Sequence, residues 1–268
     1  MYRIDYNSYR SVKSFNRRVR FLVMHYTSLD FKASVMALTG EKVSAHYLVP
    51  DPSEQTYRDA GFKDMRIFNL VDENERAWHA GVSSWAGHSH LNDSSIGVEI
   101  VNLATSHSKS SKGNADLMKP HNEEFSFSPY NPIQIDAVKE LALNILQRYP
   151  DIMPTNVVGH SDIAIGRKSD PGAAFPWKEL SRAGIGAWYD DEPKKRYQEQ
   201  FSKSFPLKEE VLAKLKCYGY DISAASTEIG YKNLIRAFQL HFRQENYDGI
   251  LDVETAAILY ALVDKYFS

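Results

Sequence analysis

The chain has 268 residues, of which 43% are hydrophobic, and its formal net charge is -2. This length supports a full hydrophobic core, with room for one large domain and a small one or for two similar ones. The small net charge and the even spread of lysine and arginine argue against nucleic acid as a partner, and no apolar run is long enough to be a transmembrane segment. Nothing in the composition indicates an oligomeric state.

Residues 1–20 contain neither an apolar segment nor a small-residue cleavage site, so they do not resemble a secretory signal. A trimmed mature form, a cytoplasmic enzyme and a leaderless exported protein all stay open. Cys217 is the single cysteine, so no disulfide can form within one chain. It lies among helix-like apolar residues, which predicts a small side chain in the core.

Strand-like runs alternate with helical patterns up to about residue 190, which predicts an α/β fold around one central sheet. The clearest helix begins at Asn131, has Pro132 at its first position and stops at Pro150. Gln134 is expected to complete a capping box at this start. The expected strands are residues 21–25, 44–49, 67–71, 96–101 and 156–158.

Residues 105–128 are rich in Ser, Lys, Asn and Gly and have almost no apolar periodicity. This composition predicts a long surface loop. His107 and His121 lie in it and are expected to be solvated rather than metal-bound. Because the loop follows the strand at 96–101, we expect it to overhang the cleft and to affect which substrates enter.

The composition changes after Trp177. Residues 190–205 are highly charged and are expected to form a connector. The remainder has helical spacing and predicts three short helices, the last of them capped by Asp252 after a turn at Gly249. The apolar positions of these helices are Leu207, Val211 and Leu215, then Leu234, Phe238 and Phe242, then Leu259, Leu262, Val263 and Tyr266.

The segment 159–172, GHSDIAIGRKSDPG, places an imidazole, an ammonium and a carboxylate in one short loop. The glycine and proline within it argue against one regular helix from His160 to Asp170. A loop folded around a cation would bring these two side chains together. Since two ligands hold zinc poorly, a third is needed.

His25 is the candidate for the third ligand. Alternation places it on one face with Phe21 and Val23, at the end of the first expected strand. A single histidine at a strand end is more often a core residue than a ligand. Two imidazoles and one carboxylate, with a fourth position left for water, nevertheless form the pattern of a catalytic zinc site.

Glu99 is a carboxylate inside an apolar strand, on the face opposite Ile96, Val98 and Ile100. A charge is costly there unless it is paired, hydrogen-bonded or used. One explanation is an edge strand with Glu99 facing solvent. The functional explanation is a general base whose proton affinity is set by burial and by a nearby metal.

Four motifs stand together in this chain: MHYT with His25, AWHAG at 77–81, SIGVEI with Glu99, and the segment 159–172. In combination they resemble the zinc-dependent N-acetylmuramoyl-L-alanine amidases of the AmpD and AmiD type, over residues 2–190. The resemblance implies a mixed β-sheet flanked by helices, with a zinc site at one sheet edge. A small helical domain would follow.

The resemblance also implies a role for each matching residue. The ligands of Zn²⁺ would be His25, His160 and Asp170. Glu99 would take the proton from the attacking water, and Lys168 would stabilise the negative oxygen that develops on the scissile carbonyl. Without its neighbours, Lys168 would be an ordinary solvated lysine.

Other positions carry less information. Trp78 and His79 resemble a segment that lines the substrate groove in the family, although a buried tryptophan with its N–H satisfied is equally consistent. His46 is expected to be a core residue, or one that supports a ligand, rather than a ligand itself. Ile165 stands where relatives often carry proline or another small residue, which affects the shape of the loop.

The implied reaction is hydrolysis of the amide bond between N-acetylmuramic acid, or its 1,6-anhydro form, and L-alanine of the stem peptide. The partners would be peptidoglycan or muropeptides, and the site of action the periplasm or the cell wall. One alternative is a recognition protein that binds peptidoglycan without cutting it, which would not need the ligands, Glu99 and Lys168 together. Another is a zinc endopeptidase of the stem peptide, which the chemistry of the site permits.

The end of the chain resembles the peptidoglycan-binding modules found beside cell-wall hydrolases, on the basis of the turn YDGILDVET at 247–255. The predicted domains are therefore a catalytic domain at 1–190, a connector at 191–205 and a helical peptidoglycan-binding-like domain at 206–268. The alternative is a helical subdomain that packs on the catalytic domain or mediates oligomerisation.

Overall fold

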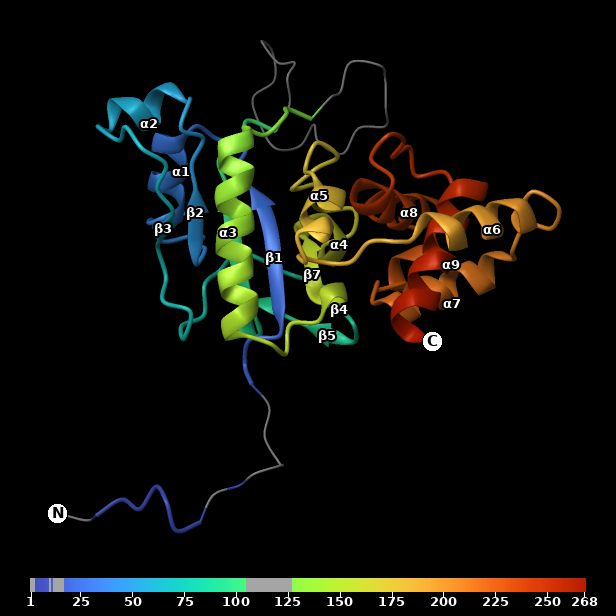
Figure 1. Cartoon of the computed structure of the whole chain (residues 1–268), viewed down its shortest axis with the longest axis horizontal. Helices are drawn as coiled ribbons and strands as arrows, with labels where there is room; N and C mark the ends of the chain where they lie inside the picture. Colours follow the sequence, from blue (N-terminus) through green and yellow to red (C-terminus); the bar gives the residue numbers. More distant parts are fainter. Residues whose placement is uncertain (1–2, 10, 12–16, 105–126) are drawn as a thin grey trace.

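A computed structural model describes residues 3–9, 11, 17–104 and 127–268 of the chain (Figure 1). The fold is mixed α/β, as predicted. Residues 105–126 of the expected loop, with His107 and His121, lie outside the described residues. Within the described ranges, no helix is both long and apolar enough to cross a membrane.

Five strands form the central sheet, in the order β3-β2-β6-β1-β7. Four of them run parallel, and β3 pairs antiparallel at one edge. Every expected strand overlaps an observed one. Their bounds are β1 Phe21–Tyr26, β2 Tyr47–Val49, β3 Phe68–Asn69, β6 Ser95–Ile100 and β7 Val157–Gly159. A separate hairpin is formed by β4 Ser84–Trp85 and β5 His88–Ser89.

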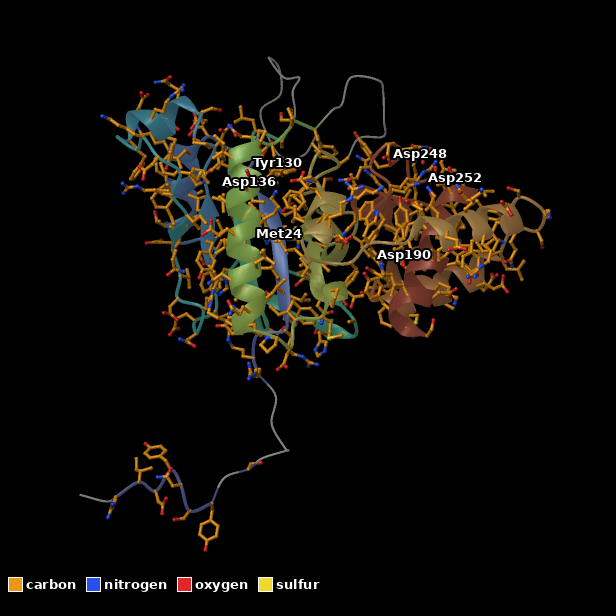
Figure 2. All side chains as sticks on the ribbon, in the orientation of Figure 1. Met24, Tyr130, Asp136, Asp190, Asp248 and Asp252 are labelled. Carbon is orange, nitrogen blue, oxygen red and sulfur yellow. The ribbon has the colours of Figure 1, made fainter. Side chains whose placement is uncertain are left out.

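Helix α3 (Pro132–Arg148) lies along the sheet (Figure 1). One face of α3, with Val138, Leu141, Ala142 and Ile145, is buried. Met24 of β1, labelled beside this helix in Figure 2, is completely inaccessible to solvent. Among the described residues before 190, the other helices are α1 Phe31–Leu38, α2 Gln55–Asp59, α4 His160–Ile163 and α5 Trp177–Arg182, and the short 3₁₀ helices are η1 Leu91–Asp93 and η3 Pro154–Asn156.

The start of α3 differs from the prediction in one respect. Asn131 caps the helix through its side chain, which accepts from the N–H of Ile133. Gln134 does not complete a capping box. It is buried and donates to the carbonyls of Val49 (3.2 Å) and Val101 (2.9 Å), so it binds the ends of two neighbouring strands. The carbonyl of Val49 also accepts from the N–H of Val101 (2.9 Å), so the buried amide adds a second donor there and supplies one to the carbonyl of Val101.

Residues 191–201 of the predicted connector form helix α6 (Asp191–Phe201). Most charged residues of α6 are exposed, whereas Phe201 packs on α9 against Ala256 and Ala257. The three helices predicted for the residues after this connector are present, and α6 precedes them. The others are α7 Lys208–Tyr218, α8 Glu228–Phe242 and α9 Val253–Phe267, with the 3₁₀ turn η4 Ser223–Ser226. Asp252 caps α9, as predicted.

The core does not divide between the two halves of the chain. One cluster of buried side chains contains strand residues such as Val158 together with Leu215, Phe238 and Leu262 of the C-terminal helices. We call residues 191–268 the helical tail, and Asp190 marks its start in Figure 2. Cys217 is exposed on α7, so the prediction of a core position was wrong.

Candidate active site and metal centre

Three of the predicted site residues lie at the carboxyl ends of neighbouring parallel strands. His25 is the penultimate residue of β1, Glu99 is the penultimate residue of β6, and the two stand opposite each other in register. His160 directly follows β7. Parallel strands bring their carboxyl ends to the same edge of a sheet, where ligand sites of α/β folds are built.

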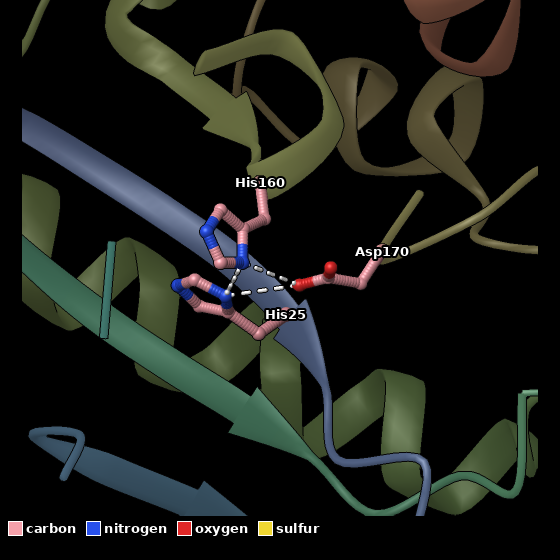
Figure 3. Close-up of side chains that lie close together, drawn as sticks. All are labelled: His25, His160 and Asp170. Carbon is pink, nitrogen blue, oxygen red and sulfur yellow. Dashed lines mark hydrogen bonds and ion pairs between the residues drawn. The ribbon is translucent and has the colours of Figure 1, made fainter. Parts of the chain in front are cut away.

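The predicted metal ligands converge. Nδ1 of His25 lies 2.9 Å from Nδ1 of His160, and each nitrogen lies 3.0 Å from Oδ2 of Asp170 (Figure 3). All three side chains are buried. Among the described residues, these three side chains bring their ligand atoms close enough together to hold a metal ion.

The hydrogen bonds behind His25 identify its free nitrogen. The hydroxyl of Ser95 donates to the carbonyl of Leu91 (2.5 Å), so it accepts from Nε2–H of His79 (3.1 Å). Nδ1 of His79 then accepts from Nε2–H of His25 (3.0 Å). Burial and the neighbouring His160 lower the pKa of His25 to about 4, so its ring is neutral near pH 7. Assigned from these partners, Nδ1 of His25 carries a lone pair that faces the cluster.

His160 is oriented in the same way. Its Nε2–H donates to the carbonyl of Ala80 (3.0 Å), so its Nδ1 is the nitrogen that faces the cluster and can offer a lone pair to an ion. Three atoms that carry lone pairs thus lie within 3.0 Å of one another. Such atoms repel unless a cation lies among them, so the residues fit a metal ion.

Glu99 has the surroundings of a proton acceptor. Its Oε2 is inaccessible to solvent and has no hydrogen-bond partner among the described residues. Burial, and then the charge of Asp170, raise the pKa of Glu99 well above its usual value, whereas Lys168 acts in the opposite direction. The half-buried Lys168 therefore stands close enough to act electrostatically on Glu99 and also on His25.

The model of the N-acetylmuramoyl-L-alanine amidase family matches residues 15–173. The chain belongs to this family. AmiD of Escherichia coli (strain K12) is 42% identical to the amidase over 251 residues, which cover 93% of this chain and 84% of AmiD. The predicted type of enzyme is thereby confirmed.

Solved structures give the same result. The crystal structure of AmpDh3 from Pseudomonas aeruginosa covers 100% of both chains at 57% identity, with a TM-score of 0.91. A structure of E. coli AmiD in complex with the substrate anhydro-N-acetylmuramic acid-L-Ala-D-gamma-Glu-L-Lys covers 98% of the amidase and 97% of that chain, at 39% identity and a TM-score of 0.82.

The structure separates the two residues that were predicted to line the substrate groove. Trp78 is 53% exposed, which suits a groove wall, and its role stays a prediction. His79 is buried behind His25, so it lies in a different place from the one expected. Its ring takes part in orienting His25. His46 is a buried core residue, as predicted, whose Nδ1 accepts from the N–H of Gly97 (3.0 Å).

Two residues that the sequence did not single out also shape the site. Arg167 donates to the carbonyls of Ala80 (2.8 Å) and Val82 (2.6 Å), and so fixes the segment against which His160 rests. Asp162 is completely buried beside His160 and is bound by residues from the helical tail. A buried aspartate two residues after a ligand was the available signal for it.

Gly97 makes room for His79. A Cβ atom at this position would lie 2.4 Å from Cγ of the His79 ring, which is held at both nitrogens. We therefore expect Gly97→Ala to lower the free energy of unfolding by about 1–3 kcal/mol, the usual cost of overpacking. Thermal or urea unfolding measures this loss. In a His79→Ala background the same substitution should cost much less, and an equal cost in both backgrounds would contradict the proposed clash.

Proposed function

We propose that the amidase uses a zinc ion held by His25, His160 and Asp170 to release the stem peptide from N-acetylmuramic acid or its 1,6-anhydro form. This proposal rests on one observation: three buried lone-pair donors converge beside the carboxylate of Glu99, whose Oε2 has no hydrogen-bond partner among the described residues. Two imidazoles and one carboxylate leave a coordination position open, as catalytic zinc sites do. The substrate in the AmiD complex supports the choice of bond.

Each side chain has a task in this reaction. A bound zinc ion supplies Lewis acidity to the scissile amide and to the attacking water. Glu99 accepts the proton of that water and passes it to the leaving amine of L-alanine, for which a raised pKa is suited. Lys168 holds a positive charge near Glu99 and stabilises the oxyanion on the carbonyl. The exposed ring of Trp78 packs against the sugar or the peptide.

The partners and the place of action follow from the same substrate. Peptidoglycan and muropeptides are found at the cell wall and in the periplasm, and we infer that the amidase acts there. The helical tail would help to hold the polymer, which raises the local concentration of substrate. Its continuity with the catalytic core means that any such binding surface is fixed relative to the active site.

The test is to incubate zinc-loaded protein separately with sacculi and with an anhydromuramoyl peptide, and to identify the released fragments by mass spectrometry. We expect intact stem peptides that begin with L-alanine. The Glu99→Gln protein, prepared in the same way, controls for contaminating hydrolases. Cuts within the stem peptide would instead indicate an endopeptidase, and binding without release of fragments would indicate a recognition protein.

A further inference from the structure

Asp162 is a buried carboxylate that the reaction does not use. It is completely inaccessible to solvent and lies in α4, the short helix whose first residue is the ligand His160. Its Oδ2 accepts from the backbone N–H of Gly159 (2.7 Å), immediately before His160. Asp162 therefore fixes the backbone at the point where β7 ends and the ligand begins.

The remaining partners of Asp162 come from the helical tail. The hydroxyl of Tyr220 donates to Oδ1 (2.6 Å), and Nδ1–H of His241 donates to Oδ2 (2.7 Å). Both donors are buried. Figure 1 places α4 beside β7, on the side that faces the tail. A buried carboxylate is costly without such donors, so Asp162 depends on them to stay in place.

Both donors pack on aromatic rings of residues that precede the helical tail. The ring of His241 stacks on Trp177 at a centroid distance of 3.8 Å, and Tyr220 packs edge-on against Trp85 at 4.7 Å. The carbonyl of Gly219 also accepts from the N–H of Ala86 (2.7 Å). A Cβ atom at position 219 would lie 2.8 Å from the Trp85 ring, so the two segments are in close contact there.

Helix α4 also contacts the second candidate ligand, Asp170, through backbone atoms. The N–H of Ser161 in α4 donates to the carbonyl of Asp170 (2.9 Å). The Gly159 backbone also packs on the ring of Pro171, because a Cβ atom at position 159 would lie 2.7 Å from its Cδ. A displacement of α4 would therefore move His160 and Asp170 together.

We propose that Tyr220 and His241 of the helical tail are positioning residues for the metal ligand His160, acting through Asp162. The tail is then a structural part of the metal centre as well as a candidate binding module. The proposal rests on the metal site of the proposed function, but it concerns residues that touch neither metal nor substrate.

The test is the zinc affinity of Tyr220→Phe, measured by competition with a chromophoric chelator well below the unfolding transition. Residues that support metal ligands typically contribute 10- to 100-fold in affinity, and we expect a loss of about 10-fold here. His241→Gln is a second variant with the same expected loss. The absorption spectrum of the cobalt-substituted protein should change in both variants, since it reports the geometry of the ligands.

Tyr197→Phe is the matched control. It removes a hydroxyl that donates to Asp264 within the tail, away from α4, so it should lower stability without changing zinc affinity. Unchanged zinc affinity in both Tyr220→Phe and His241→Gln would overturn the proposal, and so would an equal loss in the control. Unmodified protein that binds no metal would overturn the proposed zinc site, and this inference with it.

Discussion

Replacing Glu99 by glutamine is expected to lower the turnover number by about 10²–10⁴-fold, the range that a positioned general base contributes. Glutamine keeps the size of the side chain but cannot accept the proton of the water. The carboxylate it replaces is solvent-inaccessible at Oε2, has no partner among the described residues and stands in register with the ligand His25. No buried hydrogen bond is therefore lost, and folding should be preserved.

The measurement is the rate of release of L-alanyl peptide from an anhydromuramoyl peptide, with equal zinc content in both proteins. Glu73→Gln is the matched control, because Glu73 is a carboxylate that binds Tyr47 (2.7 Å), Tyr149 (2.9 Å) and Arg148 far from the ligands in the sequence. That variant should lose stability and keep its turnover. A Glu99→Gln protein that retains most of its turnover would show that another group accepts the proton.

The candidate ligands and the candidate base could be selected from the sequence because each conflicts with its local surroundings. His25 and Glu99 are polar residues inside apolar strands, and segment 159–172 collects charged side chains in a loop broken by glycine and proline. Strand alternation gave the face of each residue. The resemblance to the amidase family then indicated that the separate motifs form one site, which composition alone does not indicate.

The position of His79 was not predictable in the same way. Its ring occupies the space left by the missing side chain of Gly97, on a strand that lies far from AWHAG in the sequence. Nothing within the motif distinguishes an inward histidine from one that faces the groove. The hydrogen bond to His25 becomes visible only when β1 and β6 are paired.

The role of the helical tail was underestimated for a related reason. A charged composition predicts a solvated connector, but α6 needs only Tyr197 and Phe201 on one face to pack against α9. Likewise, Tyr220 directly follows the turn after α7 and His241 lies within α8, and neither position is distinctive in the sequence. They stand out only through their hydrogen bonds to Asp162, which lies 58 residues from Tyr220 and 79 residues from His241 in the sequence.

Removal of a metal ligand should have an equally large effect. We expect Asp170→Ala to lose bound zinc and to lower activity by about 10³-fold or more, since Lewis-acid stabilisation is worth several kcal/mol. In this variant only the two Nδ1 atoms of His25 and His160 face each other, without the carboxylate that balances the charge of the ion. Zinc content by elemental analysis and release of stem peptide are the two measurements.

Thermal unfolding distinguishes the loss of zinc binding in Asp170→Ala from a general destabilisation of the fold. A ligand that binds only the folded state stabilises it by about 2.7 kcal/mol at a hundred times its dissociation constant. Zinc should therefore raise the unfolding temperature of the chelator-treated, unmodified protein by several degrees and leave that of Asp170→Ala unchanged. Asp190→Ala, which removes an exposed carboxylate bound to Lys265, should still respond to zinc like the unmodified protein. A zinc-dependent shift that survives in Asp170→Ala would mean that the ion is held elsewhere, because the paired imidazoles alone offer too few donors to retain it.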